Sequence, residues 1–251
     1  MFNLAGPVTQ DGKAKAPVVI TDEEDRNEGK ITPTTELLIW HSKFGHIEFA
    51  KLQAMAQQGI IPKRLAKCNV PTCSSCMYAK GTKRPRRGKT IHNDPPSEPL
   101  KPGDIVSANQ MLSPVPGLIA QMTGLFTKKR YKYVTLFVDQ ASRQGYVYLQ
   151  KTASAEEMIL AKRAYKLHSS NQAVIIKAYH ANNGIFKAND WVKECRDKRQ
   201  PLTFAGVNAH HQNRIAERRI RELQELARTI LVHANRRWPK AVTANLLPYA
   251  I

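Results

Sequence analysis

Residues 131–150 read YKYVTLFVDQASRQGYVYLQ, and this stretch decides the fold. Its two halves, 131–139 and 146–150, are rich in the aromatic and β-branched residues that favour strands. Only a few residues separate them, with Gly145 directly ahead of the second half. The spacing therefore predicts two antiparallel strands joined by a short turn, a hairpin in the middle of the chain.

Strand and helix patterns alternate on both sides of this hairpin, so we expect an α/β fold in which helices pack on a mixed sheet. Short runs rich in β-branched and apolar residues predict further strands before and after the hairpin. Apolar residues at helical spacing predict three helices, the first of them opened by a capping box. The predicted strands cover 104–111 and 173–180, and the predicted helices cover 154–168, 187–196 and 213–237.

Composition divides the chain into four segments. Residues 1–33 mix Gly, Pro, Lys and an acidic run without apolar periodicity, so we expect a disordered leader. Residues 34–80 show helical spacing and predict a small helical domain, whereas 81–100 is basic and rich in structure-breaking residues, as in a linker. Residues 101–251 form the α/β domain. We expect this domain to be truncated at its C-terminus, because the chain ends soon after a further helix begins beyond Pro239.

The charge balance indicates a polyanionic partner. The chain has 39 Lys+Arg and 20 Asp+Glu, a formal net charge of +19, and nucleic acid is the partner that such a surplus favours. Scattered solvated lysines are the alternative, because net charge alone names no site. No apolar run approaches the roughly 18 residues that would span a bilayer, and the first residues lack the pattern of a secretion signal. We therefore expect an intracellular protein without a membrane partner.

A second pattern in the 34–80 segment predicts a structural zinc site. Zinc prefers four tetrahedral nitrogen and sulfur ligands, supplied as two short-range pairs, and four protein ligands leave no position open for a reactant. Ordinary histidines with a chance pair of cysteines are the alternative, and Cys68 is a rival ligand with a longer gap to its neighbour. The predicted ligands are His41, His46, Cys73 and Cys76.

Four motifs together resemble the integrase region of Ty1/copia-type retrotransposons. The motifs are WHSKFGH (40–46), CSSCMYAKGTKRP (73–85), YHANNG (179–184) and HHQNRIAERRIREL (210–223). They occur in the order found in that family, and the resemblance runs from about Glu36 to the C-terminus. It implies a pre-integrase zinc domain followed by an RNase H-like integrase core that acts in DNA integration.

The resemblance also places a catalytic triad. In that family an Asp-Asp-Glu triad holds two divalent metal ions. The family's motifs put the first Asp at Asn109, within VSANQ, and the second at Asn182, where the family has Asp-Asn-Gly. They put the Glu at Glu217, at the start of the long helix. Two of the three acids are therefore amides in this chain.

These substitutions predict that catalysis is lost. Two-metal phosphoryl chemistry needs anionic ligands, and Mg²⁺ is held mainly through carboxylates, so we expect Mg²⁺ or Mn²⁺ at the triad only if the protein is active. Arg214 is a further departure, since the family motif has Gly there. A helix salt bridge to Arg221 is an alternative role for Glu217. Asp104 and Asp139 fit strand-end or turn roles better than a displaced catalytic site.

Nucleic-acid binding can outlast catalysis, because phosphate contacts need positive charge and no carboxylates. The segment KRPRRGK (83–89) also resembles a nuclear-import signal, with a solvated linker as the alternative. The predicted nucleic-acid-binding residues are Lys83, Arg84, Arg86, Arg87 and Lys89 in the linker and Arg214, Arg218, Arg219 and Arg221 in the long helix.

Three hypotheses for function follow. The first, which we favour, is a degenerate integrase fragment that binds zinc and DNA without cutting. The second is an active integrase whose triad is misregistered here or completed within a larger assembly. The third is a non-catalytic module that pairs with other integrase subunits or with a second copy of itself.

Overall fold

The computed structural model describes residues 31–80, 99–117, 130–206 and 213–251. Contacts divide the chain into two compact units, and each is described by itself. Residues 1–83 and 228–237 belong to the first unit, and the remainder belongs to the second. Most of the predicted leader and linker, including Lys83 to Lys89, lies outside the described residues.

The first unit is built from short helices around a small apolar core. Its core consists of Leu37, Leu52, Ala56, Ile61 and Leu65. The elements of residues 31–80 are α1 (Pro33–Lys43), α2 (Phe49–Gln57), the 3-10 helix η2 (Lys63–Lys67) and α3 (Ser74–Ala79).

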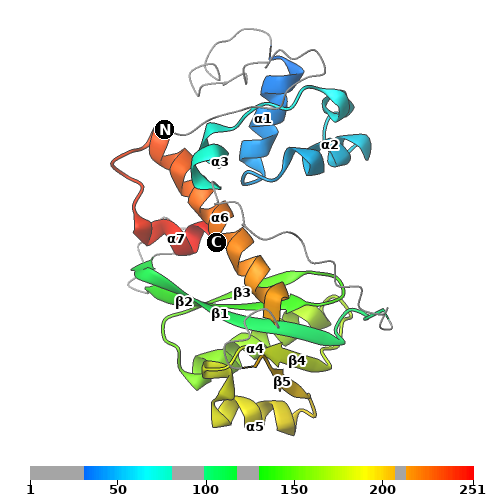
Figure 1. Cartoon of the computed structure of the whole chain (residues 1–251), viewed down its shortest axis with the longest axis vertical. Helices are drawn as coiled ribbons and strands as arrows, with labels where there is room; N and C mark the ends of the chain where they lie inside the picture. The colour runs from blue at the N-terminus through cyan, green and yellow to red at the C-terminus, as the bar shows by residue number, and fades with distance from the viewer. Residues whose placement is uncertain (1–30, 81–98, 118–129, 207–212) are drawn as a thin grey trace. The chain divides into compact units, whose positions relative to one another are not determined.

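The second unit is a five-stranded mixed sheet with flanking helices, as Figure 1 shows. The strand order is β3-β2-β1-β4-β5; β1 pairs antiparallel with β2, and β2 with β3, while β4 runs parallel to both β1 and β5. This arrangement confirms the predicted fold class, an RNase H-like mixed sheet with flanking helices, preceded by a small helical domain. The strands are β1 (Ile105–Gly117), β2 (Tyr131–Asp139), β3 (Gly145–Gln150), β4 (Ala178–Ala181) and β5 (Leu202–Phe204).

The predicted hairpin is confirmed. β2 and β3 pair from Tyr133↔Gln150 to Val138↔Gly145. The buried carboxylate of Asp139 closes the turn by accepting hydrogen bonds from the backbone N–H and the hydroxyl of Ser142, each at 2.7 Å. It also accepts one from the backbone N–H of Gly103 at 2.8 Å. Asp139 is therefore a turn residue, as its position in the sequence suggests.

Two strands differ from their predicted extents, and a third was not predicted. β1 continues six residues beyond the predicted 104–111, to Gly117. β4 is shorter than the predicted 173–180, because Ala173 lies in a turn at φ 58° and the next residues pack on Gly103 instead of pairing. A Cβ atom at Gly103 would clash with the carbonyl oxygen of Ile175. β5 was not predicted, since three residues are too few to show periodicity.

The helices of the second unit follow the predicted order. Ser154 caps α4 by accepting a hydrogen bond from the backbone N–H of Glu157 at 3.3 Å, one half of the predicted capping box. Among the described residues, no helix has both the length and the apolar character needed to cross a membrane. The elements are α4 (Ala155–Ser170), η3 (Ile185–Lys187), α5 (Asn189–Asp197), α6 (Arg214–Arg237), η5 (Ala244–Leu246) and α7 (Leu247–Ala250). Residues 214–227 of α6 belong to this unit and 228–237 to the first.

Alternation along β1 separates the two faces of the sheet. Val106 and Ala108 are buried in the core that α4 and α5 cover. Met111 has the opposite parity, and its sulfur accepts a hydrogen bond from Gln224 of α6 at 3.1 Å. Asn109 shares the parity of Met111, so its side chain belongs to the α6 side of the sheet.

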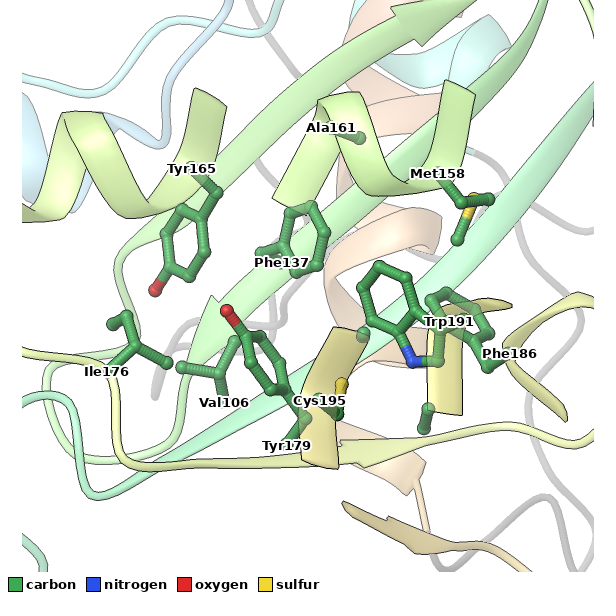
Figure 2. Packing of buried hydrophobic residues seen from close by; sticks show 12 residues of the cluster. Val106, Phe137, Met158, Ala161, Tyr165, Ile176, Tyr179, Phe186, Trp191 and Cys195 are labelled. Carbon is green, nitrogen blue, oxygen red and sulfur yellow. The ribbon is translucent and has the colours of Figure 1, made fainter. Parts of the chain in front are cut away.

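An aromatic cluster fills the core between the sheet and α4 and α5 (Figure 2). Phe137 stacks on Tyr165 with ring centroids 4.9 Å apart, and Trp191 meets Tyr179 edge to face at 6.0 Å. The amine of Lys162 is buried over the rings of Tyr179 and Trp191, at 5.4 and 5.5 Å from their centroids. Burial lowers the pKa of Lys162, and the two aromatic faces offset part of that cost.

Replacing Trp191 by Ala should lower the free energy of unfolding of the sheet unit by about 3–5 kcal/mol, because the fully buried indole would leave a cavity. Trp238→Ala is the matched control. That side chain is 59% exposed, and its removal should change the stability by no more than about 0.5 kcal/mol. Urea unfolding followed by circular dichroism measures both variants, and equal losses would contradict the central place of Trp191 in the core.

Candidate zinc centre and candidate catalytic site

The local structure of the first unit brings the four predicted zinc ligands together. His41 lies in α1, and two consecutive residues with positive φ, Gly45 at 65° and His46 at 62°, turn the chain back after that helix. A non-glycine residue at such a φ is uncommon and costs backbone energy, and such residues concentrate at functional sites. Cys73 is the N-cap of α3, and Cys76 lies in its first turn.

The ligand atoms have the spacing of a tetrahedral zinc site. All four lie within 4.8 Å of one another. Nδ1 of His46 lies 3.1 Å from Nε2 of His41, and the sulfur-to-nitrogen distances between the cysteines and these rings include 3.2, 3.5 and 3.7 Å. Tetrahedral Zn²⁺ with usual bond lengths separates two nitrogens by about 3.4 Å and a nitrogen from a sulfur by about 3.5 Å. The residues present therefore fit a zinc ion.

The ring of His41 is oriented for ligation. Its Nδ1 lies 2.7 Å from the carbonyl oxygen of Ile47 and donates to it. Because one ring nitrogen of a neutral imidazole carries the proton and the other is bare, Nε2 faces the cluster with a free lone pair. Among the described residues, Cys68 does not join the group. Its thiol instead donates to the carbonyl of Leu65 at 3.3 Å.

The proximity of the two cysteine thiols shifts their pKa values in opposite directions. A hydrogen bond with Cys76, helped by His41 and His46, lowers the pKa of Cys73 to about 2 against the opposing effect of burial. The same bond raises the pKa of Cys76 above its usual value, and the nearby Lys80 amine opposes part of this rise. Lys80 is held in place by donating to the carbonyl of His46 at 2.9 Å. Zinc binding would deprotonate both thiols, since thiolates are the metal ligands.

The second unit brings two of the predicted triad positions, Asn109 within β1 and Asn182 just after β4, next to each other. Ala108 of β1 pairs with Ala181 of β4 in parallel register, so Asn109 and Asn182 follow this pair side by side. Asn213, just ahead of α6, joins the two strands. Its Nδ2 donates to the carbonyl of Ala108 at 3.0 Å and to Oδ1 of Asn182 at 2.9 Å. Glu217 lies one helical turn further along.

Both amide oxygens at the triad positions already accept intramolecular hydrogen bonds. Oδ1 of Asn182 accepts from Asn213, and Oδ1 of Asn109 accepts from the backbone N–H of Gln110 at 2.8 Å. No role was predicted for Asn213, although it belongs to the motif that located Glu217. In the described part of the chain, the HHCC cluster is the one group of three or more His, Cys, Asp or Glu side chains with metal-binding spacing.

Asp104, one of the two acids near the triad positions in the sequence, has a structural role. It accepts from the amine of Lys177 and from the backbone N–H of Lys101, both at 2.7 Å. The bond from Lys177, ahead of that from Lys101, holds the pKa of Asp104 below its usual range. Asp104 and Asp139 thus both make the structural contacts expected of strand-end or turn residues.

Three of the predicted DNA-binding arginines form an exposed stripe on α6. Arg214, Arg218 and Arg221 follow the i, i+4, i+7 spacing of one helix face, and all three are exposed. Arg218 and the half-buried Arg219 both pair with Glu222, at 3.1 and 3.2 Å. The stripe is therefore partly neutralised at one position. The linker residues Lys83, Arg84, Arg86, Arg87 and Lys89 lie outside the described residues.

Comparison with solved structures finds retroviral integrases. The HTLV-2 integrase catalytic core domain in complex with magnesium, in its trimeric form, is 16% identical, with a TM-score of 0.38; the alignment covers 60% of this chain and 84% of that chain. The BIV integrase catalytic core domain is 15% identical, with a TM-score of 0.37 and coverage of 59% and 80%. The simian T-cell lymphotropic virus intasome, in complex with a PP2A regulatory subunit, is 16% identical, with a TM-score of 0.36 and coverage of 60% and 48%.

Comparison of the sequence itself gives one family and no individual relative. No curated protein matches the chain. Residues 23–81 match the family model of the GAG-pre-integrase domain, and this range contains His41, His46, Cys73 and Cys76. In the segment that carries the candidate zinc centre, the chain is thus similar to GAG-pre-integrase domains.

Proposed function

We propose that this chain is the integrase region of a Ty1/copia-type retrotransposon that binds structural zinc and DNA and has lost strand-transfer chemistry. The observation that carries the proposal is the pairing of Ala108 with Ala181, which sets Asn109 beside Asn182. Two amides thus lie side by side, one within β1 and one just after β4, where the resemblance expects two metal-binding carboxylates.

The electrostatics of this arrangement oppose two-metal catalysis. Mg²⁺ sheds its waters reluctantly and is usually held through one or two carboxylates plus substrate phosphates. Of the three triad positions only Glu217 retains a negative charge, and the amide oxygens of Asn109 and Asn182 are neutral and already hydrogen-bonded. A pair of ions that must stabilise both the attacking and the leaving oxygen would have one anionic ligand in place of three.

The loss of two negative charges at positions 109 and 182 favours DNA binding. Removing two acids reduces the repulsion of phosphates near Asn109 and Asn182, and the arginine stripe of α6 begins at Arg214, directly after Asn213. Guanidinium groups bind phosphate oxygens in a bidentate fashion. DNA binding without cleavage is therefore the activity that these residues favour.

Zinc in this proposal has a structural role. His41, His46, Cys73 and Cys76 would fill all four tetrahedral positions, which leaves none for water or substrate. The core of the first unit is small, with five fully packed apolar residues, and domains of this size usually need a metal or disulfides to be stable. The ion would thus supply much of the folding energy of the unit.

Replacing Cys73 by Ser should abolish stoichiometric zinc binding and reduce the helical signal of the first unit, because a structural site with three ligands loses most of its folding energy. Cys68→Ser is the matched control and should retain the ion. Metal content by mass spectrometry and far-ultraviolet circular dichroism measure the two effects. Equal zinc content in the two variants would contradict the assigned ligands.

The unaltered chain should show no nicking or strand transfer on labelled oligonucleotides in Mg²⁺ or Mn²⁺, whereas the double variant Asn109→Asp/Asn182→Asp should gain metal-dependent activity. The double variant Asn171→Asp/Asn189→Asp, which adds the same charge at exposed positions, controls for charge alone and should stay inactive. Activity in the unaltered chain that disappears in Glu217→Ala would support a functioning enzyme and overturn the proposed loss of catalysis.

Removing the arginine stripe with Arg214→Ala/Arg218→Ala/Arg221→Ala should weaken DNA binding at all sequences. The slope of log K against log salt should become shallower by about 0.9 for each phosphate that the protein no longer neutralises. Lys193→Ala/Arg196→Ala/Lys198→Ala removes the same charge from exposed positions in and just after α5 and should leave the slope unchanged. Fluorescence anisotropy across a salt series measures both. If the unaltered chain binds no DNA but associates with an intact integrase or with itself, the interaction-module hypothesis replaces this one.

A further inference from the structure

A histidine from the distant end of the chain lies against the candidate zinc centre. Nδ1 of His233, in α6, is 2.8 Å from Nε2 of His46, with ring centroids 4.9 Å apart. Residues 228–237 of α6 belong to the same compact unit as the zinc ligands. The pair is separated by 187 positions in the sequence, and the matched family model ends at residue 81.

The chemistry of imidazole decides which of the two histidines, His46 or His233, is the hydrogen-bond donor. The ligand atom of His46 is Nδ1, the nitrogen that faces His41, Cys73 and Cys76. When Nδ1 binds zinc, the neutral ring keeps its proton on Nε2. His46 is 2% exposed, so this N–H needs a protein acceptor, and Nδ1 of His233 is within hydrogen-bond distance.

The two histidine ligands therefore use different outer partners. His41 donates to a backbone carbonyl, that of Ile47, which lies six residues further along the chain, after α1 has ended. His46 uses a side chain from another element. Outer hydrogen bonds of this kind fix the tautomer and the ring orientation of a metal ligand and raise its basicity.

Two further contacts hold the same stretch of α6 against α3, the helix that carries Cys76. Arg228 donates to the carbonyl of Ala79, the last residue of α3, at 3.2 Å. Arg236 donates to the hydroxyl of Ser74, the first residue of α3. His233 lies between these two arginines in the sequence, so α6 contacts both ends of the cysteine helix as well as the ring of His46.

We propose that His233 is a positioning residue of the zinc centre, which holds His46 in the tautomer that ligates through Nδ1. The zinc-binding unit then comprises residues 31–80 together with the C-terminal part of α6. This inference rests on the proposed zinc site and adds to it a fifth residue that does not itself touch the ion.

The test compares zinc affinities of the full chain by competition with a chromophoric chelator. His233→Leu keeps a bulky side chain but removes the acceptor, and it should weaken zinc binding about 10- to 100-fold. His233→Asn retains an acceptor oxygen and should recover most of that affinity. His168→Leu is the matched control, since His168 lies in α4 of the sheet unit, and should bind zinc as the unaltered chain does.

A cobalt spectrum separates positioning from general destabilisation. Co²⁺ at the tetrahedral site gives d–d absorption that depends on ligand orientation, so the bands should shift in His233→Leu and return in His233→Asn. If His233→Leu does not fold, the zinc-loaded unaltered chain is examined by nitrogen NMR. A scalar coupling between Nε2 of His46 and Nδ1 of His233 across the hydrogen bond is expected, and a freely exchanging Nε2 proton would overturn the assignment.

The outcomes distinguish this inference from the proposed function. An unaltered chain that binds no zinc would remove the zinc site and this inference with it. Zinc binding that is equally tight in His233→Leu and in the unaltered chain, with an unchanged cobalt spectrum, would overturn the role of His233 alone.

Discussion

The parallel pairing of β1 with β4 is the constraint on which the candidate catalytic site depends. Side chains alternate between the faces of a sheet, so a slip of one residue in this pairing would send Asn109 and Asn182 to opposite faces. Asn213 reinforces the register, because a single amide group bridges the backbone of β1 and the residue that follows β4. Aromatic packing beneath the sheet, centred on Phe137 and Trp191, supports the same two strands from the other side. The strand pairing and the core packing therefore determine the positions of Asn109 and Asn182.

A different kind of constraint shapes the first unit. Its apolar core is small. The left-handed backbone at His46 costs energy, because a residue with a side chain rarely adopts a positive φ. The convergence of two imidazoles and two thiols within 4.8 Å supplies a reason for that backbone, since it aims Nδ1 of His46 at the cysteines. The unfavourable backbone conformation of His46 and the orientation of its ring toward the other ligands therefore have the same structural cause.

Many of the fold elements and the zinc ligands could be predicted from local sequence patterns. The features that could not be predicted depend on contacts between residues far apart in the chain. The hairpin of β2 and β3 shows itself in two runs of β-branched and aromatic residues, the long helix in its periodicity, and the zinc ligands in their spacing. β5 has three residues and no period to detect, and the start of β4 depends on how Gly103 packs against Ile175. The roles of Asn213 and His233 depend on contacts with residues far away in the chain. No spacing rule links His233 to His46, so only the folded arrangement reveals the pair.

The bridge made by Asn213 has a genetic consequence. Nδ2 of Asn213 can donate equally to an amide oxygen or to a carboxylate oxygen at position 182, because Asp and Asn have the same shape, so this exchange preserves the hydrogen bond. Codons for these two residues differ by a single purine at the first base. If the ancestral residues at 109 and 182 were aspartates, each was changed by one transition mutation that folding would not select against. The fold therefore places no barrier to exchange between Asp and Asn at these two positions.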